Sequence, residues 1–151
     1  MKNLLLTALI LLSFKGIAQT DNPNYDKALA EKLGADAYGM KSYMMVILKT
    51  GPNKVEDKAK LNELFKGHMN NINKLSAEGK LVVAGPFGKN DKDYRGIFIF
   101  NVKTAEEVNE MLKGDPAIQE KLLIADILPW YGSAALVEYL KVHDKIEQKK
   151  H

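Results

Sequence analysis

Hydrophobic residues in the middle of the chain form four short runs, at residues 43–48, 81–84, 96–102 and 122–130. The first two runs lead into Gly–Pro pairs at residues 51–52 and 85–86, and such pairs mark turns. Short apolar runs that are closed by turn residues predict β-strands. The polar residues 89–93 predict that the second and third strands form a hairpin, whose turn begins with Gly85-Pro86-Phe87-Gly88.

Two segments between these runs have helical periodicity instead. In the first, one face carries residues spaced three or four apart: Leu61, Leu64, Phe65, His68, Ile72 and Leu75. Gly79 is expected to end this helix, because glycine readily takes the left-handed conformation that follows a helix end. The second helix begins at Thr104, where Thr104 and Glu107 have the spacing of a capping box. Gly114 is expected to end it.

The resulting order from about Ser42 to Trp130 is β-α-β-β-α-β, the ferredoxin-like arrangement of the α+β class. Further helices are predicted on both sides: a short one that ends at Gly34, and a terminal one over residues 133–148. The sequence therefore predicts an N-terminal extension with a short helix at residues 19–41, a ferredoxin-like domain at residues 42–131 and a C-terminal helix at residues 132–151.

Residues 1–18 have the features of a signal peptide. Lys2 precedes an almost unbroken apolar run over residues 4–14, and Gly16 and Ala18 are small residues at the positions that signal peptidase inspects. The run is short for a bilayer span, so we expect cleavage after Ala18 and export to the periplasm or the medium, with no membrane association afterwards. An uncleaved membrane anchor is the alternative, which Lys15 directly after the run leaves open.

The predicted strands are apolar on both faces. Residues 44–48 and 97–100 contain no polar side chain, although an antiparallel sheet with helices on one face normally alternates apolar and polar residues. Because two helices cover only one face, the other would expose a large apolar patch. We expect a homodimer that buries this face against its own copy, since twofold pairing is the commonest symmetry. The alternative is that the flanking helices fold back over it.

Composition and charge narrow the classes of partner. The chain has no cysteine, which excludes a disulfide framework, a thiolate metal site and a cysteine nucleophile. The formal net charge is +3, and removal of Lys2 and Lys15 with the signal lowers it to +1. No stripe of basic residues with interleaved aromatics is present, so no nucleic-acid partner is expected.

Several short features of the core occur in a characteristic order. They are His68 within the first long helix, Leu75-x-x-x-Gly79, the segment 81–86 (LVVAGP), Thr104-x-Glu106-Glu107, Asp115-Pro116 and Pro129-Trp130. Together they resemble the YCII-related family over roughly ninety residues. The resemblance implies a dimeric α/β barrel, in which two ferredoxin-like halves place their sheets face to face. It also implies a histidine–aspartate pair, and an association of some relatives with elimination or isomerisation chemistry on small cyclic molecules.

On this chain the implied catalytic pair is His68 and Asp115. An imidazole gives and takes a proton near neutral pH, and a carboxylate beside it would orient the ring and stabilise the imidazolium. The structural alternatives are a core or interface histidine with one hydrogen bond, and an aspartate that caps the helical turn starting at Pro116. The two roles of Asp115 are compatible, because a carboxylate accepts several hydrogen bonds.

Asp126 and residues 85–88 are the other candidate site residues. Asp126 is an acid inside an apolar run, which would face the helices near an edge or project into a cavity between two sheets. Residues 85–88 could form a pocket rim, although the hairpin turn is the simpler interpretation. His68, His143 and His151 lack the spacing of metal ligands, and residues 85–88 are too short for a phosphate-binding loop, so neither a metal nor a cofactor is expected.

These features favour an exported, cofactor-independent enzyme that uses His68 and Asp115 for acid–base chemistry on a small molecule. The chain departs from the family pattern in its export signal, its added terminal helices and the polar residues 117–121, which leaves the substrate open. A non-catalytic module that binds a small ligand in the same pocket is the alternative. Haem is one such ligand, since dimeric barrels of this kind can hold it through a helix histidine.

Overall fold

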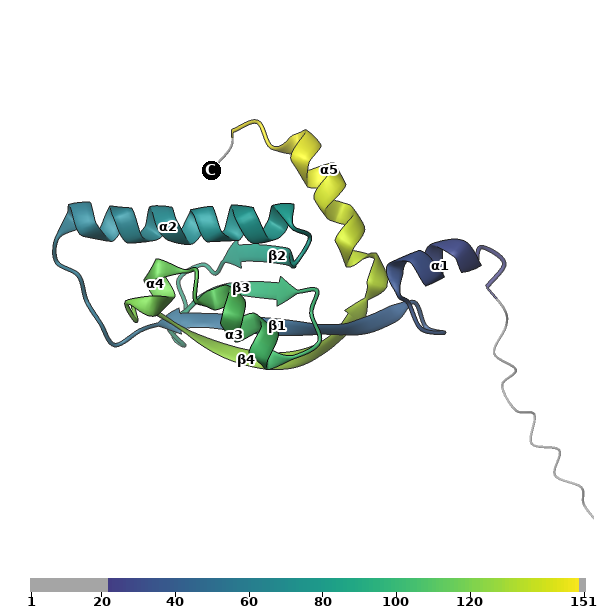
Figure 1. Cartoon of the computed structure of the whole chain (residues 1–151), viewed down its shortest axis with the longest axis horizontal. Coiled ribbons are helices and arrows are strands. Elements are labelled where there is room, and N and C mark those ends of the chain that lie inside the picture. The colour runs from purple at the N-terminus through teal and green to yellow at the C-terminus, as the bar shows by residue number, and fades with distance from the viewer. Residues whose placement is uncertain (1–21, 150–151) are drawn as a thin grey trace, which may run out of the picture.

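The computed structural model describes residues 22–149 (Figure 1). The export signal predicted at residues 1–18 lies outside this part. No helix within residues 22–149 is long and apolar enough to cross a bilayer.

A single four-stranded sheet organises the chain, with strand order β2-β3-β1-β4. The strands are β1 (Met40–Thr50), β2 (Leu81–Pro86), β3 (Tyr94–Phe100) and β4 (Leu123–Ser133). All neighbouring pairs are antiparallel, and a helix connects β1 to β2 and β3 to β4. The predicted ferredoxin-like β-α-β-β-α-β arrangement is therefore confirmed.

One face of the sheet carries the helices α2 (Lys58–Ala77), α3 (Ala105–Leu112) and the short α4 (Pro116–Gln119). Leu75 of α2, Val108 of α3 and Ala117 of α4 pack with Val46 and Phe100 of the sheet in the main hydrophobic core. The predicted helix ends are present: Gly79 has a φ of 68° after α2, and Thr104 and Glu107 form a capping box on α3.

The ends of the strands differ from the prediction. β1 and β4 are longer than their apolar runs, because residues 40–42 of β1 pair with residues 131–133 of β4. Gly85 and Pro86 belong to β2 and not to the hairpin turn, which begins after them. Proline is tolerated here because β2 is an edge strand, where one side of the backbone needs no ladder hydrogen bond.

The flanking helices lie at one end of the sheet, where β1 begins and β4 ends. α1 (Lys27–Leu33) is capped by Asp26 and ends at Gly34 as predicted. The terminal segment is not one continuous helix: β4 runs to Ser133, and a 3₁₀ helix η1 (Ala134–Glu138) then leads into α5 (Tyr139–Ile146). Figure 1 shows α5 rising from the end of the sheet on the side where α2 lies.

The second face of the sheet is covered in part. Leu136 and Val137 of η1 pack against a smaller cluster of Tyr43, Val82 and Ile99. Farther along β4, Ile124 and Leu128 keep 38% and 46% of their surface exposed. A terminal helix thus covers one part of this face, and an apolar part stays open on the described chain.

Candidate active site

Two glycines allow α2 to approach the turn between α3 and α4 closely. A Cβ atom built on Gly67 would lie 2.3 Å from Cγ of Pro116, and one built on Gly114 would lie 2.8 Å from Oδ1 of Asn71. Asn71 in turn donates from its side-chain amide to the carbonyl oxygen of Met111 at 3.3 Å. Side chains that follow these glycines are therefore brought into direct contact across the two elements.

His68 and Asp115 are those side chains. Nδ1 of His68 lies 2.6 Å from Oδ2 of Asp115, although the two residues are 47 positions apart in the sequence. The other oxygen, Oδ1, accepts from the backbone N–H groups of Ala117 and Ile118 at 3.0 and 3.3 Å. Asp115 therefore caps α4 with one carboxylate oxygen and binds the histidine with the other.

The buried carboxylate fixes the chemistry of the ring. Asp115 is fully buried and His68 is 9% exposed. An ionised carboxylate only accepts hydrogen bonds, so Nδ1 of the imidazole has to be the donor. In a neutral ring this leaves Nε2 without a proton, as a base.

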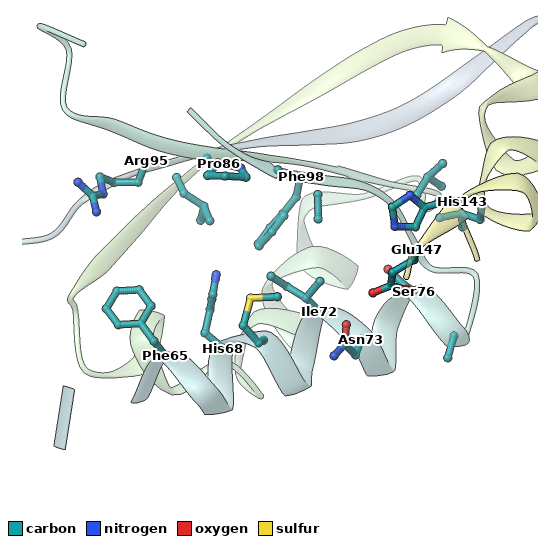
Figure 2. Close-up of a pocket in the computed structure, with 18 of the residues that line it drawn as sticks. Phe65, His68, Ile72, Asn73, Ser76, Pro86, Arg95, Phe98, His143 and Glu147 are labelled. Carbon is teal, nitrogen blue, oxygen red and sulfur yellow. The ribbon is translucent and has the colours of Figure 1, made fainter. Parts of the chain in front are cut away.

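His68 lines a cavity of about 850 Å³ between α2, the sheet and α5. Because Nδ1 is bound to Asp115, Nε2 is the nitrogen left to face a bound molecule. Figure 2 shows His68 projecting from α2 into this space, with a ring nitrogen at its tip. The ring is held between two aromatic neighbours, edge to face with Phe65 and stacked on Phe98, each at a centroid distance of 6.0 Å. The remaining lining near the ring is mostly apolar, including Met69, Ile72 and Ala84.

The opposite end of the cavity is more polar. Asn73 and Ser76 of α2 lie there with His143 and Glu147 (Figure 2). Tyr139 of α5 closes the wall and donates from its hydroxyl to the carbonyl oxygen of Val82. Burial raises the pKa of the Tyr139 phenol above its ordinary value.

Residues 42–131 match the model of the YCII-related domain. The chain belongs to the YCII-related family. Its family domain thus includes His68, Asp115 and the sheet as far as Tyr131, whereas α5 lies beyond the match.

Comparison with individual proteins adds little to the family assignment. No curated protein matches the chain. Among solved structures it is similar to the 5-chloro-2-hydroxyhydroquinone dehydrochlorinase of Burkholderia phenoliruptrix AC1100 in complex with 2,5-dihydroxybenzoquinone. The two are 21% identical with a TM-score of 0.41, and the alignment covers 58% of this chain and 92% of that one.

The other residues considered from the sequence of this YCII-related protein lie elsewhere or have other roles. Asp126 is on the sheet face away from α2, half exposed, and forms an ion pair with Lys49 at 2.7 Å. Gly85 and Pro86 line the cavity, but as part of β2. Within residues 22–149 there is no group of three or more His, Cys, Asp or Glu side chains that could hold a metal ion.

Some features of the site were missed from the sequence. Arg95 and Phe98 of β3 line the cavity, and α5 supplies its far wall. The close contact between α2 and the turn before α4 was also missed. Its signals in the sequence are Gly67, directly before His68, and Gly114, directly before Asp115. A glycine inside a helix lowers the stability of that helix, so its presence often has a packing reason. For Gly67 the reason is the close contact of α2 with Pro116, which brings His68 next to Asp115.

Proposed function

We propose that this protein is a cofactor-independent enzyme that uses His68 as a general acid–base group on a small molecule bound in the cavity. The observation that supports this most is the 2.6 Å contact from Nδ1 of His68 to a fully buried carboxylate, on a ring that also lines a cavity. A purely structural histidine has no need of a cavity beside its free nitrogen. The family domain and its fold are compatible with this role.

The proposed reaction begins with proton abstraction by Nε2 from a carbon next to a carbonyl group. The electron pair of the broken C–H bond moves into an enol or enolate, and Asp115 stabilises the imidazolium that forms. Return of the proton to another carbon gives an isomerisation. Departure of a leaving group with its electron pair gives an elimination, after which Nε2 releases the proton to that group or to water.

The surroundings suit such a step. A mostly apolar cavity strengthens the attraction between the imidazolium and Asp115, since the local dielectric constant is low. A cavity of about 850 Å³ lies within the range of roughly 300–1,000 Å³ that is typical of small-molecule sites. Substrates of one or two rings fit this range.

Deuterium exchange tests the proposal directly, because it detects proton abstraction whatever product is formed. The protein is incubated in D₂O with a panel of cyclic ketones and lactones, and incorporation of deuterium next to the carbonyl group is followed by mass spectrometry. We expect the wild type to catalyse exchange of at least one compound. His68→Gln should lower this rate about 10²- to 10⁴-fold, the usual contribution of a general acid–base group.

His143→Gln is the matched control, because His143 lines the opposite end of the same cavity and its ring contacts Tyr139. It should keep most of the exchange activity. Equal exchange by the wild type and by a folded His68→Gln variant would remove His68 from the mechanism. Binding of panel compounds without exchange would favour the non-catalytic module instead.

A further inference from the structure

Arg95 is the single arginine among the 22 lysine and arginine residues of the chain. It lies on β3 at the end of the cavity that holds Phe65 and His68 (Figure 2). Among residues 22–149, no carboxylate forms an ion pair with its guanidinium. An arginine without an acidic partner at the rim of an apolar cavity is suited to bind an anion, because its planar fork matches a carboxylate.

The arginine and lysine side chains that line the cavity and its neighbouring recess lie at the His68 end. Lys54 lines a smaller recess of about 260 Å³ that shares Phe65, Arg95 and Leu123 with the main cavity. The acidic side chains of the lining, Asp144 and Glu147, belong to the opposite end at α5. At the His68 end the one carboxylate, Asp115, is buried and occupied by His68 and the start of α4, so an anion that enters this end meets Arg95 and Lys54.

Between these ends the lining is apolar, with Met69, Ile72 and Phe98 on facing elements. The α2 residues that line it extend from Phe65 to Ala77, about 18 Å along a helix axis. A ligand with an apolar body and one terminal anionic group matches both the shape and the charge.

We propose that the cavity binds an aromatic or alicyclic carboxylate, and that Arg95 binds its anionic group at the His68 end. This inference rests on the proposed function for the identity of the cavity as the substrate site. Arg95 would be a specificity-determining residue, which fixes one end of the substrate and so places its ring carbons along Phe98 and His68.

A pair of fluorescent dyes tests the inference. 1-Anilinonaphthalene-8-sulfonate carries one anionic group, and N-phenyl-1-naphthylamine is its neutral counterpart with the same rings. For Arg95→Gln we expect the Kd of the anionic dye to rise about tenfold or more, as for loss of a charged hydrogen bond. The Kd of the neutral dye should stay unchanged. Arg95→Lys should recover part of the affinity for the anionic dye.

Two controls locate the effect. Lys89→Gln, an exposed basic residue of the hairpin turn, should leave both Kd values unchanged. Ala84→Phe puts a ring into the cavity from β2 and should weaken both dyes, provided that circular dichroism shows the fold intact.

The proposal is overturned if Arg95→Gln changes the two Kd values equally or changes neither. It is also overturned if binding of the anionic dye survives Ala84→Phe, because the anion would then bind outside the cavity. The deuterium exchange of His68→Gln is independent of these outcomes, so failure of the anion site and failure of the acid–base function can be distinguished.

Discussion

Asp115 gives each of its two oxygens a different partner. Oδ1 accepts two backbone N–H groups at the start of α4, and Oδ2 binds Nδ1 of His68. The carboxylate is fully buried, so loss of either partner would leave polar atoms without hydrogen bonds. One residue therefore supports both the local fold and the orientation of the imidazole.

Substitutions at Asp115 should separate these two roles. Asp115→Ala removes the cap and the partner of His68, and we expect a loss of about 1–3 kcal/mol in the free energy of unfolding. Asp115→Asn should cost much less, because asparagine is an equally good N-cap residue. Urea unfolding of the two variants measures the difference. Equal losses would mean that the cap contributes little to stability.

The sequence predicted this pair only through the family resemblance, and Arg95 was not predicted at all. A lone arginine next to a polar hairpin turn has the pattern of a solvated surface residue. Its place at the cavity depends on the irregular pairing of β1 with β3 between Leu48 and Lys49. The alternation of apolar and polar residues in the sequence does not indicate such a break in the strand pairing.

At the scale of elements, the contact between α2 and α4 sets the geometry of the site. Gly67 faces the ring of Pro116 with no room for a methyl group. The ring is rigid, so a larger residue at position 67 would push the two helices apart. His68 and Asp115, which lie beside this contact on the two elements, would then lose their hydrogen bond.

Gly67→Ala should therefore destabilise the protein by about 1–3 kcal/mol, the usual cost of overpacking, even though alanine is the better helix former. The double variant Gly67→Ala, Pro116→Ala should recover most of this loss, because the Cγ and Cδ atoms that crowd position 67 are gone. Thermal and urea unfolding of the single and double variants measure the coupling.

Gly88→Ala is the control, since a Cβ atom there meets nothing within 4 Å. Its effect should be small. If Gly67→Ala were as neutral as Gly88→Ala, the close approach of α2 and α4 would not be needed for the fold.

The apolar runs predicted the centres of the strands well. Gly34 and Gly79 predicted the ends of two helices, and the capping box of Thr104 predicted the start of α3. The strand ends were harder to predict, because residues 40–42 of β1, which include Lys41 and Ser42, join the sheet only by pairing with β4. The break between η1 and α5 was also missed. Packing of Leu136 and Val137 on the sheet holds this segment, and helical periodicity alone does not show it.

For the whole molecule, the uncovered part of the second sheet face bears on the oligomeric state. Ala125 and Ile127 of β4 face the helices, so Ile124 and Leu128 project from the opposite side, where they are exposed. We expect that a second copy of the chain covers this face.

Leu128→Glu should convert such a dimer into a monomer, because it would bury an unpaired charge at the interface. Val142→Glu is the matched control: Val142 is 58% exposed on α5, away from the sheet face, and its variant should remain dimeric. Light scattering coupled to gel filtration measures both masses. A monomeric wild type at micromolar concentration would contradict this expectation.

The protonation of the His68 ring tests the acid–base role most directly. Long-range ¹H–¹⁵N correlation spectra, recorded where the imidazole is neutral, identify which nitrogen carries the proton. We expect it on Nδ1, donated to Asp115, with Nε2 free toward the cavity, and we expect Asp115→Asn to move it to Nε2. A wild-type ring protonated on Nε2 would contradict the role of His68 as a base held in position by Asp115.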